Sequence, residues 1–466
     1  MHKVIPAVLI AALHGAVSVT AQACAAGTAQ QIDGNWYCSE VKAITYSNFP
    51  GSGSYDKITN MDPNTGQCTS EKHAYSGSLA PMSEELSMHF RGPTLIKQLA
   101  VYYPGSDAKV KRSDHVHAHA HRHGQQHVHH PRRDHALAGR AVGDMVVATI
   151  DGQVVSWVNK YAGPGASPNT AAAQPLPVAQ TTLATSFGTP SQAPSSTTTS
   201  ASSDPINPLP HADSSNGGSE QWARQAYFNA DAGSSEGFTF LNHFGGTNGM
   251  PGTADGGPAF GASLSFASPD GKSAAASAQT LGNKMIEDDV EIIVMSDKTC
   301  EGDSCGYTRP GGVAYHGFGG DSKLFMMEFS MPRTGKTGFN ADMPAIWLLN
   351  AQIPLTSQYG TNPKCSCWTS GCGEFDLFEI LNTGNFRCKS TLHMAPAGGS
   401  SDYFQRPEKS TIKAAVLFQA ANKAAHIKIL DNNQEFDESL AADVVEAMAQ
   451  DSGSGGQSSV FRLANS

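Results

Sequence analysis

Acidic and apolar residues alternate along the stretch Gly373-Glu374-Phe375-Asp376-Leu377-Phe378-Glu379-Ile380. Successive side chains of a β-strand point to opposite faces, so Glu374 and Asp376 share one face and the apolar residues between them share the other. Unbroken alternation would carry Glu379 to the apolar face. A β-bulge between Asp376 and Glu379 adds one residue and returns Glu379 to the acidic face. The stretch therefore predicts a buried strand that presents three carboxyl groups on one open surface.

Three carboxyl groups on one strand face indicate a particular chemistry. Retaining glycoside hydrolysis uses two carboxyl groups about 5–5.5 Å apart, one as nucleophile and one as acid/base. A third acid between them can share protons and separate their pKa values. Calcium binding and a solvated edge strand are the alternatives. The phenylalanine, leucine and isoleucine between the charges argue against an edge strand, so the pattern favours catalysis.

The surrounding sequence predicts more strands and few helices. Strand-like runs recur between Gly and Asp turns, at residues 290–294, 323–330, 346–349, 375–380 and 427–430. This pattern of short strands separated by turns predicts an all-β fold, a concave jelly-roll β-sandwich, for residues 220–466. Residues 271–273 lack the upstream glycine of a phosphate-binding loop, and no G-x-S-x-G elbow stands out. Nucleotide-binding and serine-hydrolase functions are thereby disfavoured.

Composition limits the partners. The chain has 466 residues, of which only 15% are charged, and its net charge is −10. Globular proteins contain about 25% charged residues, so the chain is poor in charge. A protein with a net negative charge has no broad electrostatic attraction to nucleic acid or to an anionic membrane. We expect neither partner.

Composition also divides the chain into six predicted segments. They are a signal peptide (1–23), a small β-rich, Gly-rich N-terminal module (24–104), a His-rich disordered insert (105–140), the end of the N-terminal module (141–162), a Ser/Thr/Pro-rich spacer (163–219) and the catalytic domain (220–466). A basic start, a short apolar run and an A-x-A end identify the signal, which is too short to span a bilayer. The C-terminus lacks the apolar tail of a lipid-anchor signal. We expect a secreted protein without a membrane anchor.

Nine cysteines fit an oxidising compartment, in which disulfides form. Their pairing is open, because six cysteines alone can pair in 15 ways. The N-terminal part holds three, and Cys24, beside the cleavage site, is the expected odd thiol. Zinc binding at Cys365 and Cys367 is disfavoured, since the chain has no C-x-x-C pair there. We expect no metal and no cofactor.

The neighbours of the acidic stretch carry a resemblance. Pro344-Ala345-Ile346-Trp347-Leu348-Leu349 precedes it and Thr391-Leu392-His393 follows it. This order resembles family 16 glycoside hydrolases, the laminarinase-type β-glucanases with a concave jelly roll. The resemblance implies that Glu374 is the nucleophile, Asp376 assists and Glu379 is the acid/base. It also places Trp347 beside the sugar cleft and His393 on the strand after the catalytic one.

A closer resemblance covers nearly the whole chain. It rests on the stretches Trp36-Tyr37-Cys38, Ala43-Ile44-Thr45-Tyr46, His89-Phe90-Arg91-Gly92-Pro93, Cys305-Gly306-Tyr307, Tyr315-His316-Gly317-Phe318 and Arg387-Cys388-Lys389-Ser390. These resemble fungal cell-wall proteins named probable circularly permuted β-1,3-glucanases. More of the 220–466 segment precedes Glu374 than follows it, which fits permutation. We add Tyr315 and His316, in a Gly-rich stretch, to the expected substrate-binding residues.

The sequence thus predicts a retaining endo-β-1,3-glucanase that acts on β-glucan of the fungal cell wall. One alternative is a glucan transglycosylase, in which a second sugar replaces water. Another is a non-catalytic wall protein that binds glucan or has a structural role, although all three acids are intact. A third alternative, which the sequence supports less strongly, is a protein that binds metal ions through the His-rich insert (105–140).

Overall fold

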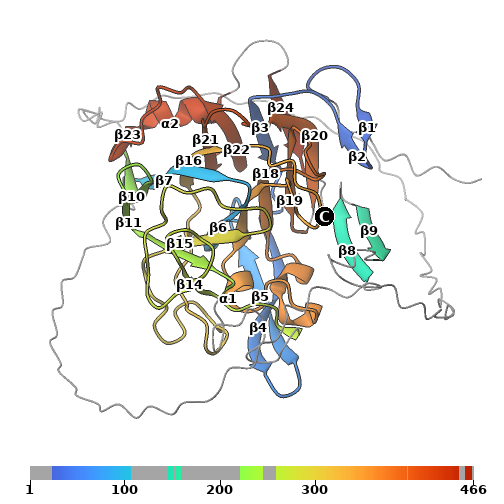
Figure 1. Ribbon diagram of the computed structural model, residues 1–466, viewed down its shortest axis with the longest axis vertical. Coiled ribbons are helices and arrows are strands. Elements are labelled where there is room, and N and C mark those ends of the chain that lie inside the picture. Colours follow the sequence, from blue (N-terminus) through green and yellow to red (C-terminus); the bar gives the residue numbers. More distant parts are fainter. Residues whose placement is uncertain are drawn as a thin grey trace, which may run out of the picture.

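The computed structural model describes residues 24–105, 145–150, 153–158, 221–244, 259–395, 397–450 and 457–463. The predicted signal peptide, the His-rich insert beyond residue 105 and the Ser/Thr/Pro-rich spacer lie outside these residues. In the predicted end of the N-terminal module, β8 (Met145–Ile150) pairs antiparallel with β9 (Gln153–Val158). The rest of the described chain is built mainly from strands (Figure 1).

Two nine-stranded sheets form a β-sandwich, as the sequence predicts. The first sheet runs in the order β11 (Ser234–Glu236), β10 (Gln221–Asn229), β7 (Leu95–Pro104), β16 (Lys323–Ser330), β21 (Ile412–Gln419), β22 (Ala424–Leu430), β3 (Ala43–Ser47) and β24 (Ser458–Arg462), with β23 (Ser439–Ala441) paired to β10. The second runs in the order β14 (Ala274–Ala275), β13 (Ser265–Ala267), β12 (Phe238–Asn242), β15 (Glu291–Ser296), β6 (Leu86–Arg91), β17 (Ala345–Asn350), β18 (Glu374–Glu379), β19 (Arg387–His393) and β20 (Gly398–Gln405). All of these pairs are antiparallel except β3 with β24.

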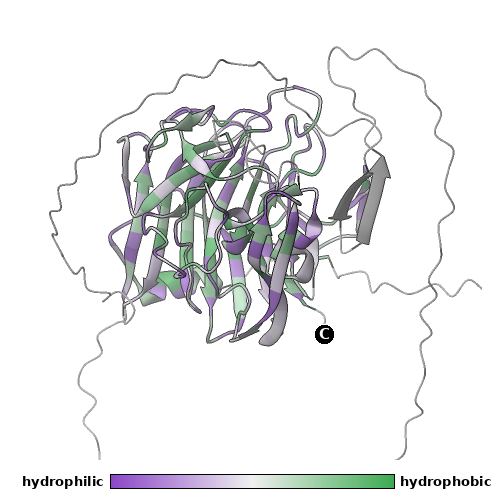
Figure 2. Ribbon diagram, turned by 90° about the horizontal axis from the view of Figure 1, so that it is seen from below, coloured by the Kyte–Doolittle hydropathy of each residue, from purple (hydrophilic) through white to green (hydrophobic). Residues whose placement is uncertain are grey.

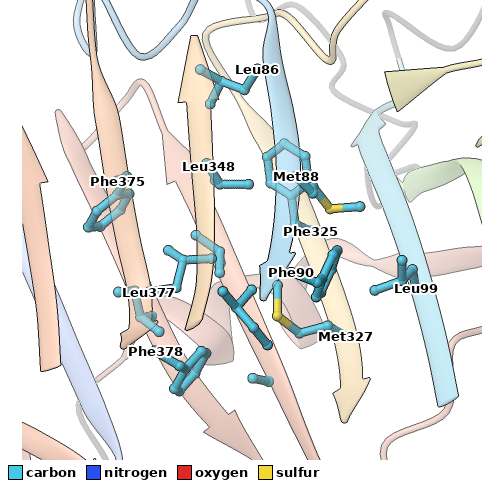
Figure 3. Packing of buried hydrophobic residues seen from close by; sticks show 14 of the residues in the cluster. Leu86, Met88, Phe90, Leu99, Phe325, Met327, Leu348, Phe375, Leu377 and Phe378 are labelled. Atoms are coloured by element: carbon cyan, nitrogen blue, oxygen red, sulfur yellow. The ribbon is translucent and has the colours of Figure 1, made fainter. Parts of the chain in front are cut away.

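Side chains from the inner faces of both sheets form the main core. Apolar and polar residues alternate along many strands (Figure 2), so each strand turns one apolar face inward. Phe90, Leu348 and Phe375 of the second sheet belong to the same buried cluster as Leu99 and Phe325 of the first (Figure 3). This burial of apolar area is the main stabilisation of the sandwich.

Helix α2 (Ala442–Ala449) packs on the outer face of the first sheet. Its buried residues Val445 and Met448 join a separate apolar cluster with Tyr102 and Met326 of that sheet. The outer face of the second sheet carries polar side chains beside two smaller apolar clusters, one around Trp347 and one around Ile293, which residues of the connecting loops complete. The site described below lies on this outer face.

The N-terminal region is β-rich, but it is not separate from the segment that follows residue 220. Strand β6 lies between β15 and β17, and β7 lies between β10 and β16. Phe90 and Leu99 on these strands are fully buried. The two segments expected from the sequence, an N-terminal module and a catalytic domain, therefore share two sheets and one core.

Two shorter hairpins come from the same N-terminal region. They are β1 (Gln30–Ile32) with β2 (Asn35–Tyr37), and β4 (Ser52–Asp62) with β5 (Gln67–Ser76). A disulfide between Cys68 and Cys365 fastens the second hairpin to the connection between β17 and β18. The backbone N–H of Asp56 also donates to Ser370 Oγ at 2.8 Å. The hairpin thereby supports the segment that leads into β18.

The remaining cysteines correct one prediction. The other three disulfides are Cys24–Cys38, Cys300–Cys305 and Cys367–Cys372. Cys24 is therefore paired, and the unpaired thiol belongs to Cys388. Cys388 lies on β19 with its side chain fully buried in the main core. A core position on a strand removes this thiol from reach of other cysteines, which the sequence did not reveal.

Candidate active site

The β-bulge predicted in β18 is present. Asp376 faces Trp347 and Phe378 faces Ile346 across β17, so Leu377 is the extra residue. The pairing with β19 shifts at the same place, between Asp376 and Glu379. Phe375, Leu377, Phe378 and Ile380 all enter the main core, as Figure 3 shows for the first three. The carboxyl groups of Glu374, Asp376 and Glu379 are left on the outer face, and we call these three residues the carboxylate row.

Glu374 begins the carboxylate row and is held by a loop. The indole Nε1–H of Trp368 donates a hydrogen bond to Glu374 Oε2. Trp368 lies on the 3-10 helix η4 (Cys367–Ser370), which the Cys367–Cys372 disulfide closes. Burial and the negative charge of Asp376 raise the pKa of Glu374 to about 8, against the opposing effects of His393 and the Trp368 hydrogen bond.

Glu379 ends the row beside an arginine from the N-terminal region. Arg91 Nη2 lies 3.4 Å from Glu379 Oε1, and Arg91 Nε donates to the carbonyl of Met343 at 2.9 Å. Burial and the charge of Asp376 raise the pKa of Glu379 to about 7, although Arg91 and His393 act in the other direction. The raised pKa values of Glu374 and Glu379 both lie near neutral pH, so these two carboxyl groups can exchange a proton there.

Asp376, in the middle of the row, pairs with a histidine. His393 Nε2 lies 2.9 Å from Asp376 Oδ2, across the β18–β19 pair. Burial lowers the pKa of His393, but the hydrogen bond to Asp376 and the negative charges of the row outweigh it and raise the pKa to about 9. The structure therefore gathers His393 and all three predicted catalytic residues in one group.

Trp347 lies on the same sheet face as the carboxylate row, but its side chain is buried by neighbouring residues. It is the cross-strand neighbour of Asp376, and only 4% of its surface is exposed. Its ring stacks on the ring of His89, with centroids 5.0 Å apart. Tyr55 and Leu349 are buried in the same apolar cluster. In this structure Trp347 is therefore a buried packing residue beside Asp376, beneath the outer surface of the second sheet.

Tyr315 and His316, the other predicted substrate-binding residues, lie elsewhere. They belong to the loop between β15 and β16, where the ring of Tyr315 packs against that of Phe266. His316 Nδ1 lies 2.7 Å from Glu85 Oε1. Among the described residues, no hydrogen bond, ion pair or ring contact joins either one to the carboxylate row. The structure thus does not gather them with the catalytic candidates.

A buried polar array beneath Trp347 was not predicted. Ser87 Oγ lies 2.7 Å from His89 Nε2, and His89 Nδ1 lies 2.6 Å from Glu291 Oε1. Ser87 and His89 are fully buried, so the serine is not an accessible nucleophile. Burial raises the pKa of Glu291, but its hydrogen bonds to His89 and Tyr359 and the nearby histidine charges outweigh it and lower the pKa to about 2. The array fixes the imidazole on which Trp347 stacks.

One pattern in the sequence indicates that the serine and histidine of this array and Arg91 lie on a common strand face. In Leu86-Ser87-Met88-His89-Phe90-Arg91 every second residue is polar, which is typical of a strand with one buried face. The alternation indicates that Ser87, His89 and Arg91 share a face. It does not indicate that this face is continuous with the carboxylate row. Trp368 gave no comparable signal, because a single aromatic residue in a loop has no period.

Metal ligation has one geometric candidate in the described part of the chain. Ligand atoms of Cys300, Cys305 and His316 lie within 4.8 Å of one another. The two sulfur atoms already form a disulfide, so neither is a thiolate that could bind a metal. Cys365 and Cys367 are likewise in disulfides, which removes the zinc alternative considered for them.

Fold and site define a β-sandwich protein that carries three interacting carboxyl groups on one outer sheet face. The chain belongs to the Tos1/YJL171C family of fungal cell wall proteins, which confirms the resemblance read from the sequence. The family described as cell wall protein YJL171C/Tos1, C-terminal, matches residues 220–448, and its N-terminal counterpart matches residues 42–104. Within the described residues, no helix has the length and apolarity needed to cross a bilayer.

Relatives match over most of their length. A protein of Arthroderma benhamiae named "Probable circularly permuted 1,3-beta-glucanase" is 43% identical over 93% of this chain and 94% of its own. The Saccharomyces cerevisiae protein of the same name with the suffix TOS1 is 40% identical over 90% of this chain and 92% of its own. The Candida albicans TOS1 protein is 36% identical over 90% of this chain and 93% of its own. No solved structure matches.

Proposed function

We propose that the protein is a retaining endo-β-1,3-glucanase, secreted to the cell wall, where it acts on β-glucan. The carboxylate row is the observation that carries the proposal, because the β18 bulge presents three carboxyl groups on one outer face. The names of the relatives support the substrate class. Family membership supports the location.

In this proposal Glu374 attacks the anomeric carbon while Glu379 protonates the departing glycosidic oxygen. A covalent glycosyl–enzyme ester forms, and the shortened chain leaves with its new hydroxyl group. Glu379, now ionised, takes a proton from water as that water attacks the ester. The second sugar is released, Glu374 is again a carboxylate, and Glu379 has regained its proton.

The electrostatics of the row supply a proton for general acid catalysis, and the assignment of the two roles follows the family resemblance. With pKa values raised to about 8 and about 7, Glu374 and Glu379 hold a proton between them at neutral pH, and the proposed roles require that proton to lie on Glu379. A neutral Glu379 adds no repulsion, which eases ionisation of Glu374. The Trp368 N–H and the protonated His393 both favour the Glu374 carboxylate. Asp376 holds His393 in place through the 2.9 Å hydrogen bond.

The test is digestion of laminarin, a soluble β-1,3-glucan, by the full chain. The full chain is required because residues 220–466 alone would lack the internal strands β3, β6 and β7. Products are read by mass spectrometry beside the matched variants Glu374→Gln and Glu379→Gln. Shortened chains that vanish in both variants support the proposal. Lengthened chains would identify a transglycosylase, and bound but unaltered glucan would identify a non-catalytic wall protein.

A further inference from the structure

Two exposed aromatic side chains flank the carboxylate row. Trp368 is 37% exposed and Tyr359 is 56% exposed, although each is hydrogen-bonded to an acidic side chain of this face. Both belong to the connection between β17 and β18. Exposed large aromatic side chains on ordered loops above a rigid sheet are a frequent feature of binding surfaces. The proposed chemistry gives no role to the ring of either residue.

The two rings lie on different sides of the row. Trp368 bonds to Glu374 on β18, and its ring centroid lies 6.1 Å from that of His393 on β19. The hydroxyl of Tyr359 donates to Glu291 Oε2 on β15 at 2.7 Å. Strands β15, β6, β17 and β18 are consecutive neighbours. Three inter-strand steps of about 4.8 Å separate β15 from β18, the strands that carry the two anchoring glutamates, by roughly 14 Å across the sheet.

Tyr359 is held in an uncommon backbone conformation. Its φ of 61° lies in the left-handed region, which a bulky side chain rarely adopts. The neighbouring backbone is tightly packed, since a Cβ added to Gly261 would meet the Gln358 carbonyl oxygen at 2.1 Å. Such strain persists where surrounding contacts enforce it and is concentrated at functional sites. The backbone of Tyr359 is therefore held before any ligand arrives, and the hydrogen bond to Glu291 orients the ring.

Trp368 is fixed by covalent means. The Cys367–Cys372 disulfide closes the turn that carries it, and the Cys68–Cys365 disulfide ties the preceding residues to the β4–β5 hairpin. A ring that is already immobile loses little conformational entropy when it binds a ligand. Both aromatic side chains are thus preorganised surfaces on either side of Glu374.

We propose that Tyr359 and Trp368 are two sugar-stacking platforms for a β-1,3-glucan chain that crosses the strands. The inference rests on the proposed function and extends it to the length of the bound substrate. The equatorial hydroxyl groups of β-glucose leave axial C–H groups on the ring faces, which bury apolar area against an aromatic face. The span exceeds one sugar ring, so a ligand that contacts both platforms is an oligosaccharide. Its bond at the carboxylate row is then an internal one.

The experiment measures binding without turnover, in the full chain carrying Glu374→Gln. Calorimetry with laminarihexaose and laminaribiose is compared before and after adding Tyr359→Ala. We expect the hexasaccharide affinity to fall at least about tenfold, as for loss of one aromatic contact, and the disaccharide affinity to fall less. Tyr359→Phe keeps the ring and should retain the affinity. Trp36→Ala, at another exposed aromatic residue (45%), is the matched control.

The outcomes separate this inference from the proposed function. Thermal unfolding of each variant first establishes that the fold is intact. An unchanged hexasaccharide affinity in a folded Tyr359→Ala variant overturns the platform, even if the unmodified chain digests laminarin. An equal loss in Tyr359→Phe also overturns it, because the hydroxyl contact to Glu291 would then be the cause. A selective loss in Tyr359→Ala supports it, even if the unmodified chain proves unable to hydrolyse glucan.

Discussion

The hydrogen bond from Trp368 to Glu374 can be removed with little change of shape. Trp368→Phe keeps a six-membered aromatic ring at the surface and deletes the pyrrole part of the indole together with its N–H. That N–H lowers the pKa of Glu374, so its loss raises this pKa further. Because the proposed nucleophile must be ionised, activity should be lost mainly at low pH.

The size of the effect follows from one hydrogen bond to a charged acceptor. Such a bond contributes about 1.5–3 kcal/mol, and the partial exposure of Trp368 favours the lower end. One pKa unit corresponds to about 1.4 kcal/mol. We therefore expect the acidic limb of the pH profile to move up by about one unit. At pH values below the acidic limb, kcat/KM of Trp368→Phe should be about tenfold lower than that of the unmodified chain.

The assay is the pH dependence of kcat/KM for laminarin, which reports the ionisation of the free enzyme. Trp36→Phe is the matched control and should leave both limbs in place. An acidic limb that stays where it is in Trp368→Phe would contradict the reasoning. An upward shift of the alkaline limb instead would mean that Glu374 is the general acid, since a raised pKa extends protonation to higher pH.

Three further predictions concern the fold. Residues 220–466 expressed alone should not fold, because the first sheet loses its internal strands β3 and β7 and the second loses β6. Co-expression of residues 24–105 should restore soluble protein, and cooperative unfolding of 220–466 by itself would contradict the shared core. Phe90→Ala should lower the unfolding free energy by about 3–5 kcal/mol in urea titrations, the cost of a large cavity at a fully buried site, and a loss below about 1 kcal/mol would refute tight packing there. Replacing Cys68 and Cys365 together by serine opens a link across 297 residues and should cost about 2–5 kcal/mol, seen as a lower Tm; an unchanged Tm would show that the link is dispensable.

The local sequence pattern was enough to predict the strand that carries the carboxylate row. The bulge in β18 follows from a conflict between two-residue periodicity and the position of Glu379, both readable within eight residues. The same alternation marks β6 as a strand with one apolar and one polar face, although Ser87 and His89 on the polar face are buried as well. The pattern does not identify the strands that pair with β6, because antiparallel partners can come from any distance along the chain. For this reason the sharing of both sheets between the two expected segments could not be predicted, since β6 and β7 pair with strands far along the chain.

The loop residues of the site were beyond sequence reasoning for another reason. Trp368 and Tyr359 are single aromatic residues without periodicity, and only the folded chain brings them to Glu374 and Glu291. Cysteine pairing failed similarly, because Cys68 meets Cys365 through the approach of the β4–β5 hairpin. Tyr315 was selected by its local sequence, and the fold then carried it to a different loop cluster.

The most direct test of the central claim is the anomeric configuration of the first products. Proton NMR during early laminarin digestion by the full chain distinguishes β from α reducing ends before they equilibrate. Attack by Glu374 followed by water inverts the anomeric carbon twice, so the account predicts new β ends, and none with Glu374→Gln. Initial α ends, or undiminished turnover by Glu374→Gln, would contradict a covalent intermediate on Glu374.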